Sequence, residues 1–161
     1  MKKVKAQKFI QEGRTLAYEL DNEFSKEKKK YMLWGILPDE ECEVNILRTK
    51  KGINYCEVAE LIKKSNKRIS EIEDHYLSCS PFSVLDYEYE LQVKEELLAE
   101  LFSDHSDEFN LKPITDYNIY NYRNKIEYNF WEVEKDNPET LEFSFFVRES
   151  KRRVIIDSCI L

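Results

Sequence analysis

The sequence predicts an α+β protein in which a small N-terminal β-barrel, of the OB or SH3-like type, precedes a helix and an antiparallel β-meander. Three observations support this prediction. Short, loosely alternating apolar segments separated by turn residues fill the first 64 positions. A helical apolar stripe follows within residues 83–103, and two runs with two-residue alternation lie within residues 111–161. We therefore expect a barrel domain at 1–64, a linker at 65–82, a helix at 83–103 and a meander at 111–161.

Five candidate strands predict the barrel. They begin near Val4, Thr15, Tyr31, Cys42 and Ile53. Five short strands within about 60 residues are typical of a small barrel that closes on itself. The polar stretch Ser65–Arg68 predicts that the barrel ends there and that a linker begins.

The helix prediction rests on one apolar stripe. Tyr87, Leu91, Leu98 and Phe102 recur at helical spacing, and glutamates cover most of the remaining surface. Ser83 is the expected N-cap residue, because an acidic residue follows it three positions later.

The meander prediction rests on alternation in the last part of the sequence. Ile126, Tyr128 and Phe130 alternate with polar residues, and Leu141 to Val147 repeats the pattern. We expect the first three side chains to belong to a buried face. Trp131 and the similarly placed Phe146 are expected on the opposite face, as surface candidates or packed on the helix.

The charge distribution and the apolar content bear on whether the chain binds phosphates, spans a membrane or is secreted. The net charge is −7, but residues 1–70 hold 16 Lys and Arg against 11 Asp and Glu, whereas residues 71–110 hold one lysine against 12 acids. An acidic chain can still bind phosphates through a locally basic module. No apolar run reaches the ~18 residues of a membrane span, and the basic start lacks the apolar core of a secretory signal. We expect a cytoplasmic protein with free thiols and no membrane partner.

Basic clusters and aromatic residues form the candidate RNA-binding surface. The basic clusters are Lys28–Lys30, Lys50–Lys51, Lys63–Lys64 and Lys67–Arg68. Six aromatic residues surround Arg123 and Lys125: Tyr117, Tyr120, Tyr122, Tyr128, Phe130 and Trp131. Rings that stack on bases, together with cations that hold the backbone, are what single-stranded RNA recognition requires. The alternatives are an ordinary solvated surface for the lysines and a core role for the strand aromatics.

We predict six RNA contacts: Arg123, Lys125, Lys50, Lys51, Lys67 and Arg68. No DNA partner is expected. The sequence shows no recognisable active-site motif. The four cysteines are widely spaced without a CxxC and the two histidines are far apart, and no glycine-rich loop for a nucleotide occurs because each glycine stands alone. We expect no catalytic residue and no metal site in this chain.

Two stretches resemble the RNA (uracil-5-)methyltransferase family. Asn121–Phe130 is similar to the family motif Y-R-N-K-x-E-[FY]. Tyr87–Lys94 resembles the family helix Y-x-x-Q-L-x-x-K, with Glu90 in place of the glutamine.

The front of the chain looks like a TRAM domain, the small RNA-binding barrel that precedes the catalytic part of many such enzymes. The residues that carry this resemblance are Glu12–Arg14, Leu37–Val44 and Ser65–Arg68. Asp39 stands where the family usually has glycine. The resemblance implies an OB-like fold for the barrel and RNA as its partner.

The family transfers a methyl group from S-adenosylmethionine to uracil in tRNA or rRNA, through a catalytic cysteine. None of the four cysteines here lies in the family's catalytic motif, and nothing of the cofactor-binding domain follows Leu161. We expect the N-terminal, RNA-recognising part of such an enzyme, which binds RNA but does not methylate it unaided. S-adenosylmethionine would be bound by the missing domain.

Many TRAM-bearing members also hold a 4Fe–4S cluster through four cysteines. Aligned on the helix, the first three cluster positions fall at Glu71, Leu77 and Ser80. Cys79 is one residue out of register, and Cys159 matches the fourth position. Because a cluster needs about four thiolates, we predict that none is bound.

The sequence is also compatible with two other functions. The chain could be a stand-alone RNA-binding module, such as an RNA chaperone or a ribosome-associated protein, or a protein-interaction domain that uses its acidic helix. Without a catalytic domain to cover it, the stripe of Leu91, Leu98 and Phe102 would be exposed, covered by self-association or folded onto the meander.

Overall fold

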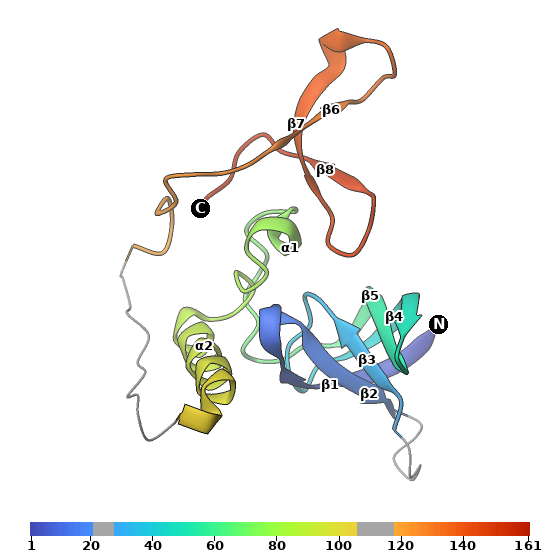
Figure 1. The fold of residues 1–161 in the computed structure, drawn as a ribbon, viewed down its shortest axis with the longest axis vertical. Coiled ribbons are helices and arrows are strands. Elements are labelled where there is room, and N and C mark those ends of the chain that lie inside the picture. Colours follow the sequence, from blue (N-terminus) through green and yellow to red (C-terminus); the bar gives the residue numbers. More distant parts are fainter. Residues whose placement is uncertain (21–27, 106–117) are drawn as a thin grey trace.

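The N-terminal domain is a closed five-stranded barrel, as Figure 1 shows for the computed structural model, which describes residues 1–20, 28–105 and 118–161. The strands are β1 (Lys2–Phe9), β2 (Thr15–Glu19), β3 (Lys30–Leu33), β4 (Glu41–Lys50) and β5 (Ile53–Lys63). They close in the order β1-β2-β3-β5-β4, with β3 and β5 parallel and the other pairs antiparallel. The predicted OB-like barrel is confirmed.

The barrel forms because alternate side chains of each strand meet in its interior. In β1, Val4 and Ala6 are buried while their neighbours Lys3 and Lys5 are exposed. The interior is filled by Val4, Ala6, Ala17, Tyr31, Leu33, Ile36, Cys42, Val44 and Cys56.

Residues 65–82 are more structured than the linker we expected. Arg68 forms an isolated β-bridge with Leu85, and the Ile69 N–H donates to the Val84 carbonyl at 2.9 Å. The segment also contains α1 (Tyr76–Cys79). It is therefore packed against the start of the following helix rather than free.

Helix α2 (Tyr87–Leu101) confirms the predicted helix but begins later. Asp86 caps it, accepting hydrogen bonds from the backbone N–H groups of Glu88 and Tyr89 at 3.2 and 3.3 Å. Ser83 is not the cap, since the chain between Ser83 and Asp86 is not helical and buries Val84.

The face of α2 that packs is a second apolar stripe. Tyr89, Val93 and Leu97 lie in a cluster with Phe9 and Leu37 of the barrel side. The helix therefore folds onto the barrel and not onto the C-terminal sheet. In the expected stripe, Leu91 and Leu98 are half-buried and Phe102 is 37% exposed.

The C-terminal sheet is an antiparallel meander, β6 (Asn129–Glu132), β7 (Leu141–Phe146) and β8 (Arg153–Ile155), which extends away from the barrel in Figure 1. Register places Phe130 opposite Phe143 and Trp131 opposite Glu142. Trp131 and Phe146 thus lie on the face opposite Phe130, as predicted. The prediction that Tyr128 and Phe130 are buried is wrong.

That correction has a simple structural reason. Only the near end of the face is covered, where Phe145 meets the ring of His75 at a centroid distance of 5.7 Å. Beyond it no described residue covers the sheet, so Phe130 is 65% exposed and Phe143 49% exposed.

Short 3-10 turns also lie at Gln11–Gly13, Ser103–His105 and Pro138–Thr140. Among the described residues, no helix is long and apolar enough to cross a membrane. Tyr117 and the start of the expected meander range at 111–117 lie outside the described residues.

Candidate nucleic-acid interface

One end of the barrel carries a row of lysines, which we call the basic edge and define as Lys28, Lys29, Lys30, Lys50 and Lys51. Lys30 pairs with Ile53 across β3 and β5, and Ile53 pairs with Lys50 across β5 and β4. The three adjacent strands therefore bring together two lysine clusters that lie 20 residues apart in the sequence. All five side chains are exposed.

In the part of the chain that the structure describes, the lysines of the basic edge form no ion pair. Lys28 Nζ lies 6.0 Å from the centre of the Tyr18 ring. Glu19 interacts electrostatically with Lys29 but is engaged by Lys2, whose hydrogen bond is the largest cause of the lowered Glu19 pKa. This end of the barrel can attract phosphates electrostatically.

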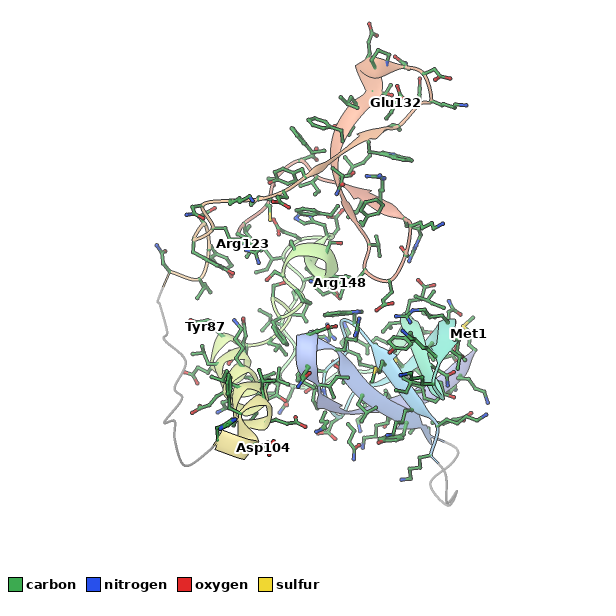
Figure 2. All side chains as sticks on the ribbon, in the orientation of Figure 1. Met1, Tyr87, Asp104, Arg123, Glu132 and Arg148 are labelled. Carbon is green, nitrogen blue, oxygen red and sulfur yellow. The ribbon has the colours of Figure 1, made fainter. Side chains whose placement is uncertain are left out.

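The C-terminal sheet presents uncovered aromatic rings. Phe130 packs on Phe143 at a centroid distance of 5.2 Å, and Tyr128 lies 5.3 Å from Phe143. On the opposite face the Arg153 guanidinium lies 4.1 Å from the Phe146 ring centre and 4.8 Å from that of Trp131. Figure 2 shows the ring side chains along both faces of this sheet. Exposed rings combined with cations suit stacking on nucleobases.

The other predicted contacts are dispersed. Arg123 and Lys125 lie on the coil before β6, where both are exposed and Lys125 pairs with Glu127 at 2.7 Å. Lys67 sits at the barrel end of the molecule, with Nζ 5.5 Å from the Tyr89 ring centre. In Figure 2 Arg123 and Met1 lie on opposite sides of the molecule. The structure joins Lys50 and Lys51 into one surface but does not join them to Arg123.

Arg68 is a correction. Its side chain is 6% exposed, and its Nε and Nη2 donate to the two carboxylate oxygens of Glu40 at 2.8 Å each. A further bond from Nη2 reaches the Gly35 carbonyl at 2.7 Å. This guanidinium is committed inside the protein and is not available to a phosphate.

An arginine cluster between barrel and sheet was not found from the sequence. Glu149 accepts from Arg14 at 2.7 Å and from Arg48 at 2.9 Å. Arg48 also lies 3.8 Å from the Tyr55 ring centre, and Arg148 lies 4.2 Å from that of Trp34. These three arginines come from three different segments, so no local motif could reveal them.

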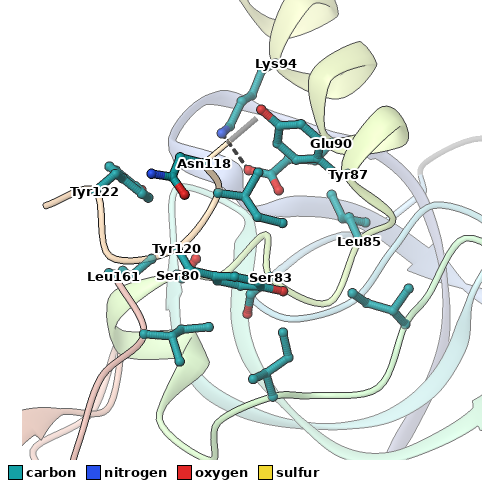
Figure 3. Close-up of a pocket in the computed structure, with 14 residues that line it drawn as sticks. Ser80, Ser83, Leu85, Tyr87, Glu90, Lys94, Asn118, Tyr120, Tyr122 and Leu161 are labelled. Atoms are coloured by element: carbon teal, nitrogen blue, oxygen red, sulfur yellow. Dashed lines mark ion pairs between the residues drawn. The ribbon is translucent and has the colours of Figure 1, made fainter. Parts of the chain in front are cut away.

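A pocket of about 310 Å³ separates α2 from the coil that carries Arg123 (Figure 3). Its lining mixes apolar and polar side chains, and includes Tyr120 and the Lys94–Glu90 ion pair. Tyr122, which lies on the coil, also lines this pocket.

Four potential ligand side chains meet at α1, although no metal was predicted. Ligand atoms of Glu73, His75, Cys79 and Cys159 all lie within 4.8 Å of one another. Burial, and then the nearby Cys159, raise the pKa of the Cys79 thiol to about 12. The sequence held two signals. The i, i+4 spacing of His75 and Cys79 puts both on one side of a helical turn, and Cys79 and Cys159 lie near or at two cluster positions of the family that the chain resembles.

These residues do not fit the 4Fe–4S cluster of the resembling family. The chain has four cysteines, and two of them, Cys42 and Cys56, are buried in the barrel interior. Only Cys79 and Cys159 remain, whereas such a cluster is held by four thiolates.

Comparison with known proteins points to one class of enzyme. No protein-family model matches the chain. It is 26% identical over 136 residues to the 23S rRNA (uracil(1939)-C(5))-methyltransferase RlmD of Aliivibrio salmonicida (strain LFI1238). It is 27% identical over 137 residues to the proteins of that name from Aliivibrio fischeri strains MJ11 and ATCC 700601 / ES114.

Each alignment covers 83% of this chain but 31% of the relative, so the chain spans about a third of the length of these relatives. Because 83% is more than either the barrel or the C-terminal part contributes alone, the similarity extends over both. This agrees with the resemblance to uracil-5-methyltransferases that the sequence motifs indicate.

Proposed function

We propose that this chain is the RNA-recognition part of an S-adenosylmethionine-dependent RNA methyltransferase that makes 5-methyluridine, with rRNA as the favoured substrate. The observation that carries the proposal is the similarity to 23S rRNA uracil-5-methyltransferases across barrel and sheet together. A barrel alone would support only a general binding role, because small barrels of this kind serve many functions.

The barrel acts as a TRAM-like module that binds RNA phosphates without reading sequence. Its basic edge supplies five exposed lysines, and Lys50 and Lys51 are held at a tight turn where Gly52 has a φ of +77°. The turn keeps two lysines next to each other at one end of the barrel, which favours contact with phosphates.

The C-terminal sheet and its leading coil hold the substrate loop. Exposed Tyr128, Phe130 and Phe143 provide rings on which unpaired bases stack, and Arg123 supplies a cation on the coil that leads into the sheet. The target uridine would have to leave its stack before methylation. S-adenosylmethionine supplies the methyl group, and residues outside this chain would bind it and carry the catalytic cysteine.

The experiment is a binding titration on the 161-residue chain by fluorescence anisotropy. The probe is a labelled RNA hairpin with a uridine-containing loop, measured over a series of salt concentrations. Lys50→Ala and Arg123→Ala should each weaken binding and lower the salt slope by about 0.7–1, the loss expected for one phosphate contact.

The matched control is Lys8→Ala. It removes the same charge from the same barrel, but Lys8 is already paired with Glu100 at 2.8 Å. Unchanged affinity and salt slope in both Lys50→Ala and Arg123→Ala would overturn the assigned contacts. Failure of the wild-type chain to bind the hairpin at low salt would overturn the proposed function itself.

A further inference from the structure

We infer that Glu73, His75, Cys79 and Cys159 form a mononuclear site for a divalent metal ion of the zinc type. The site is independent of RNA recognition. It rests on the donor set, on a buried imidazole nitrogen without a hydrogen-bond partner, and on the way two distant segments are held together.

The donor set matches what zinc binds. Two thiolates, one imidazole and one carboxylate are the three ligand classes found in tetrahedral zinc sites. With metal–ligand bonds of about 2.0–2.3 Å, tetrahedral ligand atoms lie roughly 3.3–3.8 Å apart. The four side chains already place their ligand atoms within 4.8 Å of one another. Small side-chain movements would therefore complete the coordination.

His75 provides the second, independent observation. The residue is 4% exposed, and its Nε2 has no hydrogen-bond partner although Glu73 Oε2 lies 3.2 Å away. Its other ring nitrogen, Nδ1, lies 3.2 Å from the Asp74 carboxylate. When Nδ1 carries the proton toward Asp74, Nε2 turns a lone pair toward the Glu73 carboxylate. A cation between the two acceptors removes this conflict, and a carboxylate behind a ligating imidazole is the usual arrangement in zinc sites.

Backbone contacts hold the two halves of the site in place. The Ile160 N–H donates to Glu73 Oε1 at 2.8 Å, which fixes Cys159 beside α1. The Ile160 carbonyl accepts from the Asn121 N–H at 2.6 Å. The ring of His75 is further supported by Phe145 of β7. Metal binding would thus join residues 73–79 to the C-terminal segment and to the sheet.

The test uses the full chain, reduced and stripped of metal by a chelator. Titration with Co²⁺ should give the visible bands of tetrahedral cobalt and a thiolate-to-cobalt charge-transfer band, saturating at one ion per chain. Zn²⁺ should displace the cobalt and bind more tightly than about 1 µM in competition with a chromogenic chelator.

Three variants test the ligands. Cys79→Ser and Cys159→Ser should each lower the intensity of the thiolate-to-cobalt charge-transfer band in proportion to the one thiolate that is lost. Glu73→Gln keeps the side-chain shape and the acceptor for Ile160, so it tests the site even where a cysteine variant does not fold. It should weaken Zn²⁺ binding by at least the ~10–100-fold that loss of an outer partner costs. Cys56→Ala, in the barrel interior, is the matched control and should bind as the wild type.

Several results would overturn the inference. These are an octahedral cobalt spectrum without charge transfer, wild-type binding by Cys79→Ser or Glu73→Gln, or a Cys79–Cys159 disulfide that persists under the reducing conditions of the titration. Assembly of an iron–sulfur chromophore with several irons per chain would also overturn it, because the site would then not be mononuclear.

Discussion

At the scale of single residues, Arg68 forms a buried ion pair with Glu40 in place of the predicted RNA contact. A basic side chain in a polar stretch looks like a surface residue, but Glu40 is fully buried and needs a cationic partner. The Glu40 carboxylate also accepts from the backbone N–H groups of Leu37 at 2.8 Å and Ser65 at 3.0 Å. It thereby ties the start of the 65–82 segment to the β3–β4 connection.

Arg68→Ala should therefore act on stability and not on RNA contact. Removing one partner of a buried pair leaves the other charge uncompensated, which costs about 3–5 kcal/mol of unfolding free energy. Urea denaturation of Arg68→Ala against Lys67→Ala measures this difference, since Lys67 is exposed beside it. A change below ~0.5 kcal/mol in Arg68→Ala would show that the pair is not the anchor described here.

The same pair predicts a pH dependence of stability. Burial alone would raise the pKa of Glu40, but the hydrogen bonds from Arg68, Leu37 and Ser65 outweigh it and lower the pKa below its ordinary value of 4.5. A carboxylate with a lowered pKa stabilises the fold above its ordinary pKa, and this contribution is lost as the pH falls through the folded-state value.

Glu40→Gln should consequently lower the melting temperature most at neutral pH. The gap to the wild type should shrink as the pH drops below about 4.5. Melting curves of both proteins over a pH series measure it. A gap that stays constant or widens toward acid would contradict the assigned cause.

At the scale of elements, the structure decides which of two residues caps the start of α2. Both Ser83 and Asp86 are good capping residues by type, but only Asp86 accepts from helical N–H groups. Asp86→Ala should cost about 1 kcal/mol of unfolding free energy. Ser83→Ala is the control and should be nearly neutral, because the buried Ser83 hydroxyl has no hydrogen-bond partner among the described residues. Equal losses in the two variants would be inconsistent with Asp86 as the cap.

The exposed face of the β6–β7–β8 sheet makes a prediction about binding. Phe130→Ala should weaken binding of a single-stranded RNA by about 1–3 kcal/mol, the usual value of one stacked base, while leaving the fold intact because the ring is 65% exposed. Val133→Ala, 48% exposed just beyond the end of β6, removes apolar surface without removing a ring. If both variants bind RNA as the wild type does, stacking on this face is excluded.

Much of the element order could be predicted from periodicity alone. In a strand with one buried face, apolar side chains recur every two residues, so the five barrel strands and the two longer strands of the meander could be predicted. The packing face of α2 was not, because Tyr89, Val93 and Leu97 form as good a stripe as Tyr87, Leu91 and Leu98. Sequence cannot say which stripe a neighbour will cover. The same limit applies to the sheet, where alternation gave the faces correctly but not their exposure.

At the scale of the whole molecule, the candidate sites depend on contacts that no local pattern encodes. The basic edge forms because β3 and β5 run parallel, and the Glu73–Cys159 group forms because the C-terminal segment returns to α1. The junction between barrel and sheet includes the Arg152–Glu57 ion pair at 2.7 Å, the contact of Arg148 with the Trp34 ring, and one acidic residue of the sheet that binds two barrel arginines. Glu149, whose side chain is 13% exposed, lies in the β7–β8 turn with a φ of +61° and joins Arg14 and Arg48 of the barrel.

Glu149→Ala should loosen the sheet from the barrel without unfolding either. Burial alone would raise the pKa of Glu149, but Arg48 and Arg14 outweigh it and lower the pKa, so the carboxylate is charged when it bridges the two parts. Losing its charge-assisted bonds should lower the opening free energy of β7 and β8 by roughly 1.5–3 kcal/mol and leave β1 and β2 protected. Hydrogen exchange followed by mass spectrometry measures both regions in one experiment.

Glu142→Ala, an exposed acid on the same sheet, removes equal charge away from the junction and should leave the exchange pattern unchanged. If the barrel strands open together with the sheet in Glu149→Ala, the two parts fold as a single cooperative unit, and the proposed phosphate-binding and base-stacking surfaces cannot be adjusted separately.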